Sequence, residues 1–286
     1  MMKKIRIAIL VFFLAVASVF TYTYVKRRLS VDFHAPVITA EEGVLTVSIT
    51  ATEQDLLRGM TARDNIDGDV TDTLVVTSKS KFISKGRLRV NYAAFDSNKN
   101  VGTASREVVY VDYVPPRFHL YEPQRYSSSA SGIDYLEHMT AEDCLDGNIT
   151  QQIKISFGNT TAVSSSSTIQ RINVQVTNSG GDTSVLELTA SMEDYLLYSE
   201  SAPALKEYIA YVPQGGTINL RGYIVGIWSA GSVKSFSDTR YTAANVSIDE
   251  TGLDYSTPGV YKVIFRLRSN DMTELGTAEL FVVVEE

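Results

Sequence analysis

The residues of this sequence whose types could do chemistry are mostly acidic, and they gather in one loop and one later turn. The loop carries Asp64, Asp67, Asp69 and Asp72, and the turn carries Asp96. Carboxylate oxygens are hard ligands of the kind that Ca²⁺ takes in proteins. The spacing differs from that of an EF-hand, because no Glu occupies the twelfth position. These aspartates form a candidate calcium site, and calcium is the single cofactor that the sequence suggests.

A purely structural role would explain the same loop without an ion. Asp and Asn side chains accept hydrogen bonds from backbone N–H groups in tight turns, and Gly68 can supply a positive φ. A related loop later in the chain has Asn148 in place of Asp69 and Gln151 in place of Asp72. The metal interpretation is therefore weaker for the later loop, and for the first loop both interpretations stay open.

Catalytic signatures are missing from the sequence. His34, His119 and His138 fall in a linker, at a strand start and in a repeated loop, so none is placed as a general base. No Gly-x-Ser-x-Gly elbow, His-Glu-x-x-His helix or phosphate-binding loop occurs. The lone cysteine, Cys144, replaces Asn65 of a repeated loop, which favours a structural thiol. We predict no enzymatic activity; an exported enzyme that acts on a polymer is the minor alternative.

Aromatic residues offer a different kind of binding surface in the last third of the chain, where Tyr223, Trp228, Phe236 and Tyr241 lie. Exposed rings of this kind would suit a sugar or a protein partner, whereas buried ones would belong to a core. The sequence favours the core for the single Trp and assigns no ligand-binding residue. An extracellular protein or glycan is the expected class of partner.

Charge divides the chain into two parts. Residues 1–31 hold six basic residues and no acidic one, which leaves 20 of the 26 Lys and Arg against all 33 Asp and Glu, or −13, for the rest. A body of that charge repels phosphate backbones, so nucleic acid is excluded as the main partner. The single Cys excludes an internal disulfide framework.

The basic part brackets an apolar segment. No residue from Ile7 to Val25 is charged, and at about 1.5 Å per residue a helix of this length spans roughly 28 Å, close to the hydrocarbon thickness of a bilayer. The segment predicts a cytosolic tail and signal anchor within residues 1–31. A cleaved signal peptide is the rival, because Ala15-Val16-Ala17 has the small-x-small form of a cleavage site. Both predict export: a single-pass protein of the cell membrane with extracellular C-terminal domains, or a secreted one.

Beyond the anchor, apolar and polar residues alternate with period two, as in half-buried antiparallel strands. The clearest runs begin at Leu45, Leu88, Ile172 and Tyr261, and Gly, Asn, Asp and Ser clusters separate them. Such short strands with frequent turns are typical of β-sandwiches.

An internal repeat organises these strands. Residues 56–71 and 135–150 share Met-Thr-Ala, Asp-x-x-Asp-Gly and a final Thr, and a third copy is visible only in its tail, where Leu-Gly-Thr-Ala at 275–278 echoes Val-Gly-Thr-Ala at 101–104. Prolines near 115 and 203 mark the borders. The predicted domains are 32–114, 115–201 and a divergent 202–286.

The first repeat resembles a known family. Met60-Thr61-Ala62-Arg63-Asp64-Asn65-Ile66-Asp67-Gly68-Asp69-Val70-Thr71, followed by a strand and the turn Asp96-Ser97-Asn98-Lys99-Asn100, is similar to the bacterial surface Ig-like repeat, which also occurs in secreted and pesticidal crystal proteins. Lys99 stands where that family has Gly. The resemblance implies an all-β fold of tandem immunoglobulin-like β-sandwich domains after the transmembrane helix, an extracellular location and no activity of its own.

Together these features predict a membrane-anchored extracellular bacterial surface protein, non-catalytic, whose Ig-like domains serve as a binding, adhesion or spacer stalk. The alternative is a structural subunit of a cell-envelope assembly that packs against other proteins. The membrane itself is the one partner the sequence names, through the N-terminal helix.

Overall fold

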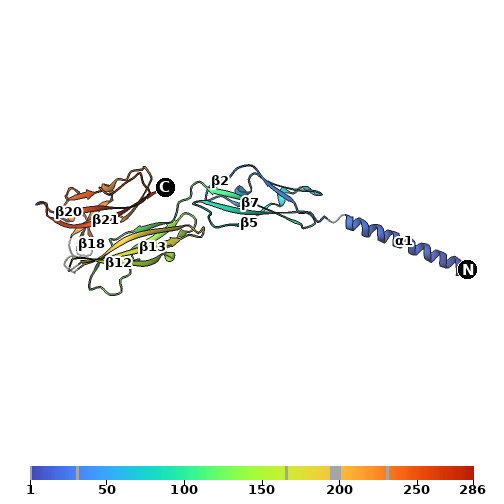
Figure 1. Ribbon diagram of the computed structural model, residues 1–286, viewed down its shortest axis with the longest axis horizontal. Helices are drawn as coiled ribbons and strands as arrows, with labels where there is room; N and C mark the ends of the chain where they lie inside the picture. Colours follow the sequence, from blue (N-terminus) through green and yellow to red (C-terminus); the bar gives the residue numbers. More distant parts are fainter. Residues whose placement is uncertain (1, 30–31, 165–166, 194–200, 230–231) are drawn as a thin grey trace. The chain divides into compact units, whose positions relative to one another are not determined.

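The computed structural model describes residues 2–29, 32–164, 167–193, 201–229 and 232–286. The protein consists mostly of β-strands in sheets, with one N-terminal apolar helix (Figure 1). It divides into two compact units, Met1–Tyr113 and Val114–Glu286, which we call unit 1 and unit 2. The predicted border between residues 201 and 202 lies inside unit 2 and stays a prediction.

The N-terminal helix, α1 (Met2–Leu29), contains a stretch from Lys3 to Lys26 that is long and apolar enough to cross a membrane. Its large apolar side chains, such as Phe12 and Phe20, are not covered by other described parts of the protein. A helix of this kind is consistent with a signal anchor or with a signal peptide, in agreement with the two alternatives left open by the sequence.

Unit 1 has two sheets. One contains β1 (Val37–Ala40), β3 (Met60–Asp64) and β4 (Gly68–Asp69), in that order. The other has the order β2-β7-β6-β5, with bounds Leu45–Val47, Val101–Tyr110, Arg87–Phe95 and Val75–Lys79. A short helix, α2 (Glu53–Leu57), and a 3-10 turn (Thr71–Thr73) connect them.

The predicted alternation of side chains is confirmed in β6. Leu88, Val90 and Tyr92 are at most 3% exposed, while Arg89 between them is exposed. This alternation is expected because successive side chains of a strand point to opposite faces of the sheet. The same holds in unit 2, where Ile172, Val174 and Val176 are buried.

The described residues of unit 2 form four sheets with the following strand orders and bounds. The first is β11 (Gly147–Asn148), β10 (Met139–Asp143), β8 (Arg117–Leu120). The second is β12 (Lys154–Ser164), β13 (Ser167–Thr177), β14 (Thr183–Glu193), β9 (Arg125–Ser127). The third is β15 (Ala202–Leu205), β17 (Ile224–Ser229), β18 (Ser232–Lys234). The fourth is β16 (Ile209–Pro213), β21 (Glu274–Glu285), β20 (Gly259–Arg268), β19 (Val246–Asp249).

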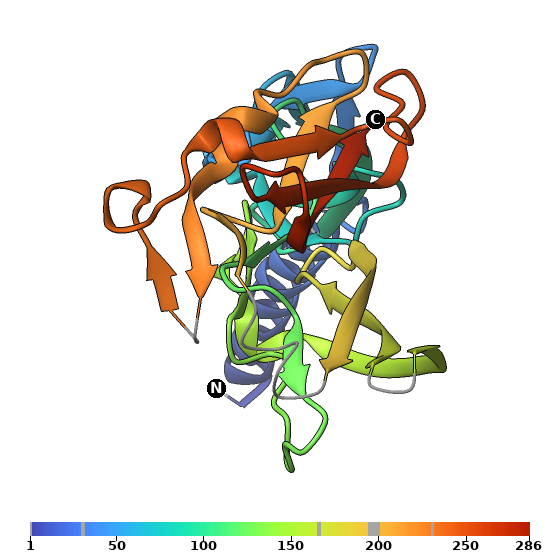
Figure 2. The ribbon, with the colours of Figure 1, turned by 90° about the vertical axis from the view of Figure 1, so that its left-hand side faces the viewer.

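One strand order recurs three times along the chain. In β2-β7-β6-β5, β9-β14-β13-β12 and β16-β21-β20-β19, a short early strand pairs in parallel with the last strand, which pairs antiparallel with the strand before it. Strands β20 and β21, orange-red to dark red in Figures 1 and 2, show this antiparallel pair. Each of these sheets is accompanied by a three-stranded sheet.

Close backbone contact explains the repeated Gly in the tail motif. A Cβ on Gly102 would lie 1.9 Å from the carbonyl oxygen of Pro36, and a Cβ on Gly276 would lie 2.5 Å from that of Ser201. Only glycine fits where two backbones approach so closely. In both places the last strand of a repeat touches the chain just before its first strand.

The buried residues of unit 2 form a continuous core. It extends from Phe118 and Leu120, through Leu186 and Leu188, to Phe265 and other residues of the last sheets. Polar contacts join the same segments. Tyr208 N donates to Leu120 O at 2.8 Å, and the Tyr211 hydroxyl accepts from Phe118 N at 2.7 Å.

Candidate functional site

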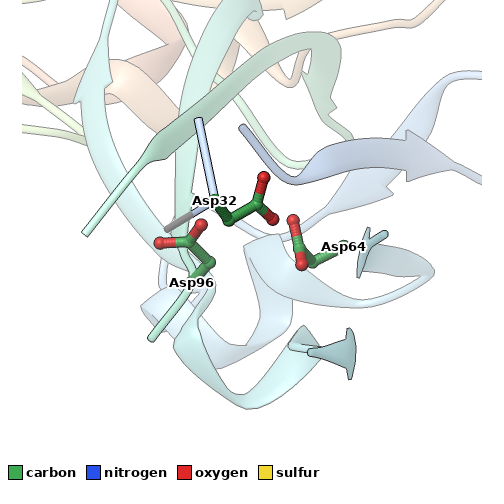
Figure 3. Close-up of side chains that lie close together, drawn as sticks. All are labelled: Asp32, Asp64 and Asp96. Carbon is green, nitrogen blue, oxygen red and sulfur yellow. The ribbon is translucent and has the colours of Figure 1, made fainter. Parts of the chain in front are cut away.

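Three buried carboxylates converge at one end of unit 1. Asp32, Asp64 and Asp96 are 4%, 6% and 7% exposed, and each offers an oxygen within 4.8 Å of the other two (Figure 3). Asp32 lies between α1 and β1, Asp64 is the last residue of β3, and Asp96 directly follows β6. The ends of two strands from different sheets and the segment that enters β1 therefore build the cluster.

One oxygen of each carboxylate accepts hydrogen bonds from backbone N–H groups of the same turn. Asp64 Oδ1 accepts from Ile66 N at 2.8 Å and Asp67 N at 2.9 Å, and Asp96 Oδ1 accepts from Asn100 N at 2.6 Å. Asp32 Oδ1 accepts from His34 N at 2.9 Å. This last hydrogen bond, from the His34 backbone, is the main reason why the pKa of the Asp32 carboxyl is lowered.

Two amides link the carboxylates to one another. The Asn65 amide, oriented to satisfy its neighbours, donates from Nδ2 to Asp32 Oδ2 at 3.0 Å and to Asp64 Oδ2 at 3.3 Å. Asn100 Nδ2 donates to Asp96 Oδ2 at 2.6 Å and to the backbone oxygen of Asp32 at 3.0 Å. Among the described residues, the single ion pair of the cluster is between Asp32 and His34, whose side chain is 80% exposed. Neutral donors therefore surround most of this negative charge.

The arrangement fits the chemistry of a hard divalent cation. All three side chains offer oxygen, and two oxygens bound to one Ca²⁺ at about 2.4 Å can be at most about 4.8 Å apart. The separation of the three carboxylates lies within that limit. A bound cation would also offset three carboxylate charges, which are costly to bury close together.

The five predicted ligands separate into two groups. Asp64 and Asp96 belong to the cluster. Asp67 instead accepts from Ser97 N at 2.8 Å and from the Ser97 hydroxyl at 3.0 Å, and Asp69 accepts from Thr71 N at 3.0 Å. Asp72 is exposed in the 3-10 turn. Asp67 and Asp69 thus accept hydrogen bonds from turn residues.

Asp32 was missed by the sequence reasoning because it precedes the repeated motif. Its sequence position carries one signal: it lies four residues before Pro36, as Asp112 lies four residues before Pro116. Asp112 differs from Asp32 in its contacts, because its carboxylate accepts a hydrogen bond from Ile49 N at 2.8 Å.

The second repeat builds the same loops with one carboxylate replaced. Asp143 Oδ1 accepts from Leu145 N at 2.9 Å, as Asp64 Oδ1 does from Ile66 N. In place of Asp96 stands Asn178, 4% exposed, whose Nδ2 donates to Asp143 Oδ2 at 3.0 Å. In the second repeat a neutral amide therefore faces the carboxylate, whereas the first repeat has a second carboxylate at that place.

Lys99 takes the backbone conformation that glycine favours. Its φ is 69°, in the left-handed region, which is uncommon for a residue with a side chain. Lys99 N donates to the backbone oxygen of Asp96 at 3.2 Å, which closes the turn that carries this carboxylate.

The other candidate residues lie apart from this cluster. His119 Nδ1 is 2.6 Å from Glu207 Oε1, and this contact raises the pKa of His119; His138 Nε2 is 3.3 Å from Glu122. Trp228 is 9% exposed, which confirms the core interpretation of this residue, and Tyr241 is also buried, at 8% exposed.

No known protein family matches this chain, and no curated protein does. Among solved structures, it is similar to the CBM51-2 and INT domains of Clostridium perfringens ZmpB, a structure in complex with GlcNAc, at 13% identity and a TM-score of 0.22 over 55% of this chain and 41% of that one. It is also similar to the Protocadherin GammaB4 extracellular domain, at 11% identity and a TM-score of 0.20 over 87% of this chain and 49% of that one. The chain thus spans less than half the length of either. Both are β-rich extracellular domains.

Proposed function

We propose that this protein is a membrane-anchored, extracellular bacterial surface protein whose immunoglobulin-like sandwich domains form a non-catalytic binding, adhesion or spacer stalk. The observation that carries the proposal is the threefold recurrence of one strand order after a single helix of membrane-spanning length. Repeated β domains of this kind present surfaces at a distance from an anchor, and they need no reactive group to do so.

Retention of the helix is part of the proposal. The apolar run continues well past the small-x-small site at Ala15-Val16-Ala17, whereas a cleavable signal turns polar near its cut. A chain that keeps α1 stays with the membrane in alkaline carbonate, and external protease on intact cells removes the part after residue 32. Recovery of a soluble chain that begins near residue 18 would contradict the anchor.

Calcium binding by Asp32, Asp64 and Asp96 is the second part. The contrast between the two repeats supports it, because the first repeat places a carboxylate where the second has the amide of Asn178. The test is isothermal titration of the detergent-solubilised chain with CaCl₂. One site is expected, and Asp64→Asn should abolish it while Asp143→Asn should leave it unchanged. Equal binding by both variants would contradict the assignment.

A subunit of a cell-envelope assembly is the second candidate, supported by the long exposed strand β12. Residues 156–163 of this strand are all exposed, and they include Phe157 and Val163, which are 57% and 60% exposed. Gentle solubilisation followed by size analysis separates the two candidates. A chain that migrates alone supports the stalk, and one that co-purifies with defined partners in fixed ratio supports the subunit.

A further inference from the structure

The end of unit 1 that carries the three carboxylates also exposes large apolar side chains. Phe33, Ile66, Phe95 and Val101 are 81%, 59%, 39% and 47% exposed. Phe33 directly follows Asp32, Ile66 lies two residues after Asp64, and Phe95 directly precedes Asp96. Each buried carboxylate therefore has an exposed apolar neighbour within two residues.

Hydrogen bonds hold these four side chains at one end of the unit. Phe95 and Val101 are cross-strand partners at the end of the β6–β7 hairpin. The Asp67 carboxylate accepts from Ser97 N, which ties the turn that contains Ile66 to this hairpin. Asn100 Nδ2 donates to the backbone oxygen of Asp32, which ties the segment that contains Phe33 to the same place.

The chain itself limits how far this end can be from the membrane. Three peptide units separate Leu29, the last residue of α1, from Asp32, and at about 3.8 Å each they reach at most about 11 Å. The polar headgroup region on each side of a bilayer is about 5–7 Å thick. If α1 spans the bilayer, the apolar end of unit 1 is within reach of the headgroups. The basic residues Lys26 to Arg28, at the end of the helix, are of the sign that pairs with lipid phosphates.

The second repeat shows that the fold does not require this exposure. Thr177 and Thr183 occupy the places of Phe95 and Val101, and their hydroxyls are 2.8 Å apart. Leu145, in the place of Ile66, is half-buried. The second repeat therefore forms the same pair of turns without large exposed apolar side chains at these positions. The exposed apolar side chains of the first repeat, which follows α1, need a cause other than the fold.

We infer that this end of unit 1 rests on the bilayer that α1 spans, with Phe33 and Ile66 inserted among the lipid headgroups. The inference rests on the proposed anchor. Exposed apolar surface is transferred favourably from water into the membrane interface, and attachment through α1 keeps the surface close enough for the transfer to occur. The contact would restrict how unit 1 tilts on its anchor, so the direction in which the extracellular part extends would depend on it.

Tryptophan fluorescence in vesicles tests the contact with the full-length chain. The variants Phe33→Trp and Ile66→Trp, in a Trp228→Phe background, are reconstituted in phosphatidylcholine and phosphatidylglycerol vesicles with or without brominated acyl chains. Ile83→Trp is the matched control, because Ile83 is 53% exposed and lies near the opposite end of β6, where its N–H bonds to Arg87 O. The nine residues of β6 separate the two ends by about 30 Å.

We expect brominated lipid to reduce the emission of the Trp at positions 33 and 66 by at least about twofold, and that of the control by much less. Equal, weak quenching at all three positions would overturn the inference. A blue-shifted emission at positions 33 and 66 without quenching would also overturn it, in favour of contact with a second copy. If Trp228→Phe impairs folding, the comparison is made as difference spectra with Trp228 retained.

Carbonate extraction of the same vesicles separates this inference from the proposed anchor. A chain that resists extraction but shows no quenching retains its anchor and refutes only the lipid contact. A chain that carbonate releases refutes both, because without the anchor nothing holds unit 1 near the bilayer.

Discussion

Replacing Asp96 by Asn would give the first repeat the amide that the second repeat already uses. In the second repeat, Asn178 Nδ2 donates to Asp143 Oδ2 at 3.0 Å, and both residues are buried. Asp96→Asn puts a donor at the corresponding place beside Asp64 and removes one negative charge. The variant should therefore be more stable than the wild type in the absence of divalent ions, and less responsive to calcium.

The magnitude follows from the geometry. At the upper limit of 4.8 Å for the separation of the carboxylate oxygens, two unit charges repel each other by about 3.5 kcal/mol at an effective dielectric constant of about 20. The substitution disturbs the bond from Asn100 Nδ2 to Asp96 Oδ2, which costs about 1 kcal/mol. A net stabilisation of unit 1 by about 2 kcal/mol remains, which corresponds to a rise in Tm of at least about 8 °C for a domain of this size.

Calcium should reverse the order of stability. At a free concentration about 100 times its Kd, a ligand that binds only the folded state stabilises it by about 2.7 kcal/mol. Calcium at this concentration should stabilise the wild type by this amount and the variant by much less, because the variant lacks one of the three carboxylate ligands. Calorimetry of the full chain in detergent, with EDTA or with CaCl₂, measures both effects.

Two further variants act as controls. Asp72→Asn removes the same charge from an exposed position of the same loop and should change neither quantity by more than about 0.5 kcal/mol. Asn178→Asp makes the converse change in the second repeat and should destabilise unit 2 in EDTA. If Asp96→Asn destabilises unit 1 in EDTA, or if calcium stabilises variant and wild type equally, the electrostatic reasoning is refuted.

Three other predictions concern packing and pH. Gly102→Ala places a Cβ 1.9 Å from Pro36 O and should lower the free energy of unfolding by about 2–4 kcal/mol in a denaturant titration. Gly252→Ala, with open space around the added Cβ, should be nearly neutral. A tolerated Gly102→Ala would contradict the close approach of the two backbones. Glu207 raises the pKa of His119 by a hydrogen bond, so this pair's contribution to folding stability is complete below pH 6.5 and is lost as the pH rises through the higher folded pKa. NMR titration should show that the pKa of His119 falls in Glu207→Gln. An unchanged titration would refute the pairing. Hydrogen bonds from the Ser48 hydroxyl and Ile49 N lower the pKa of Asp112, so its contribution to folding stability is present above pH 3.8 and is lost as the pH falls through the lower folded pKa. The acid unfolding of Asp112→Asn should therefore depend less steeply on pH than that of the wild type. Identical unfolding profiles of variant and wild type would argue against this role of Asp112.

Local patterns in the sequence predicted several of the longer strands. The alternation in 87–92 predicted the first part of β6 with the correct buried face, because burial in a half-buried strand alternates from one residue to the next. Ile49 departs from its predicted run: β2 ends at Val47, and a turn begins where Ile49 N bonds to the Asp112 carboxylate. That bond joins segments 63 residues apart, which no local pattern contains.

The site was predictable only where it coincides with the repeat. Asp64 and Asp96 were found because they lie in motif positions with metal-ligand chemistry. Asp32 reaches them through the pairing of β1 with β3 and through the Asn100 amide, both of which are tertiary contacts. Asp67 and Asp69 were included because spacing alone does not show whether a carboxylate points into the cluster, to a neighbouring turn as Asp67 does, or to its own turn as Asp69 does.

The continuous core of unit 2 has a mechanical consequence. Because the buried residues on either side of position 201 form one cluster, pulling the chain from its C-terminus would load the last two strand repeats together. Stretching the molecule should then lengthen it in two large steps, one for each compact unit, although the same strand order occurs three times. A protein built in this way should extend in fewer and larger steps than three independently folded domains would.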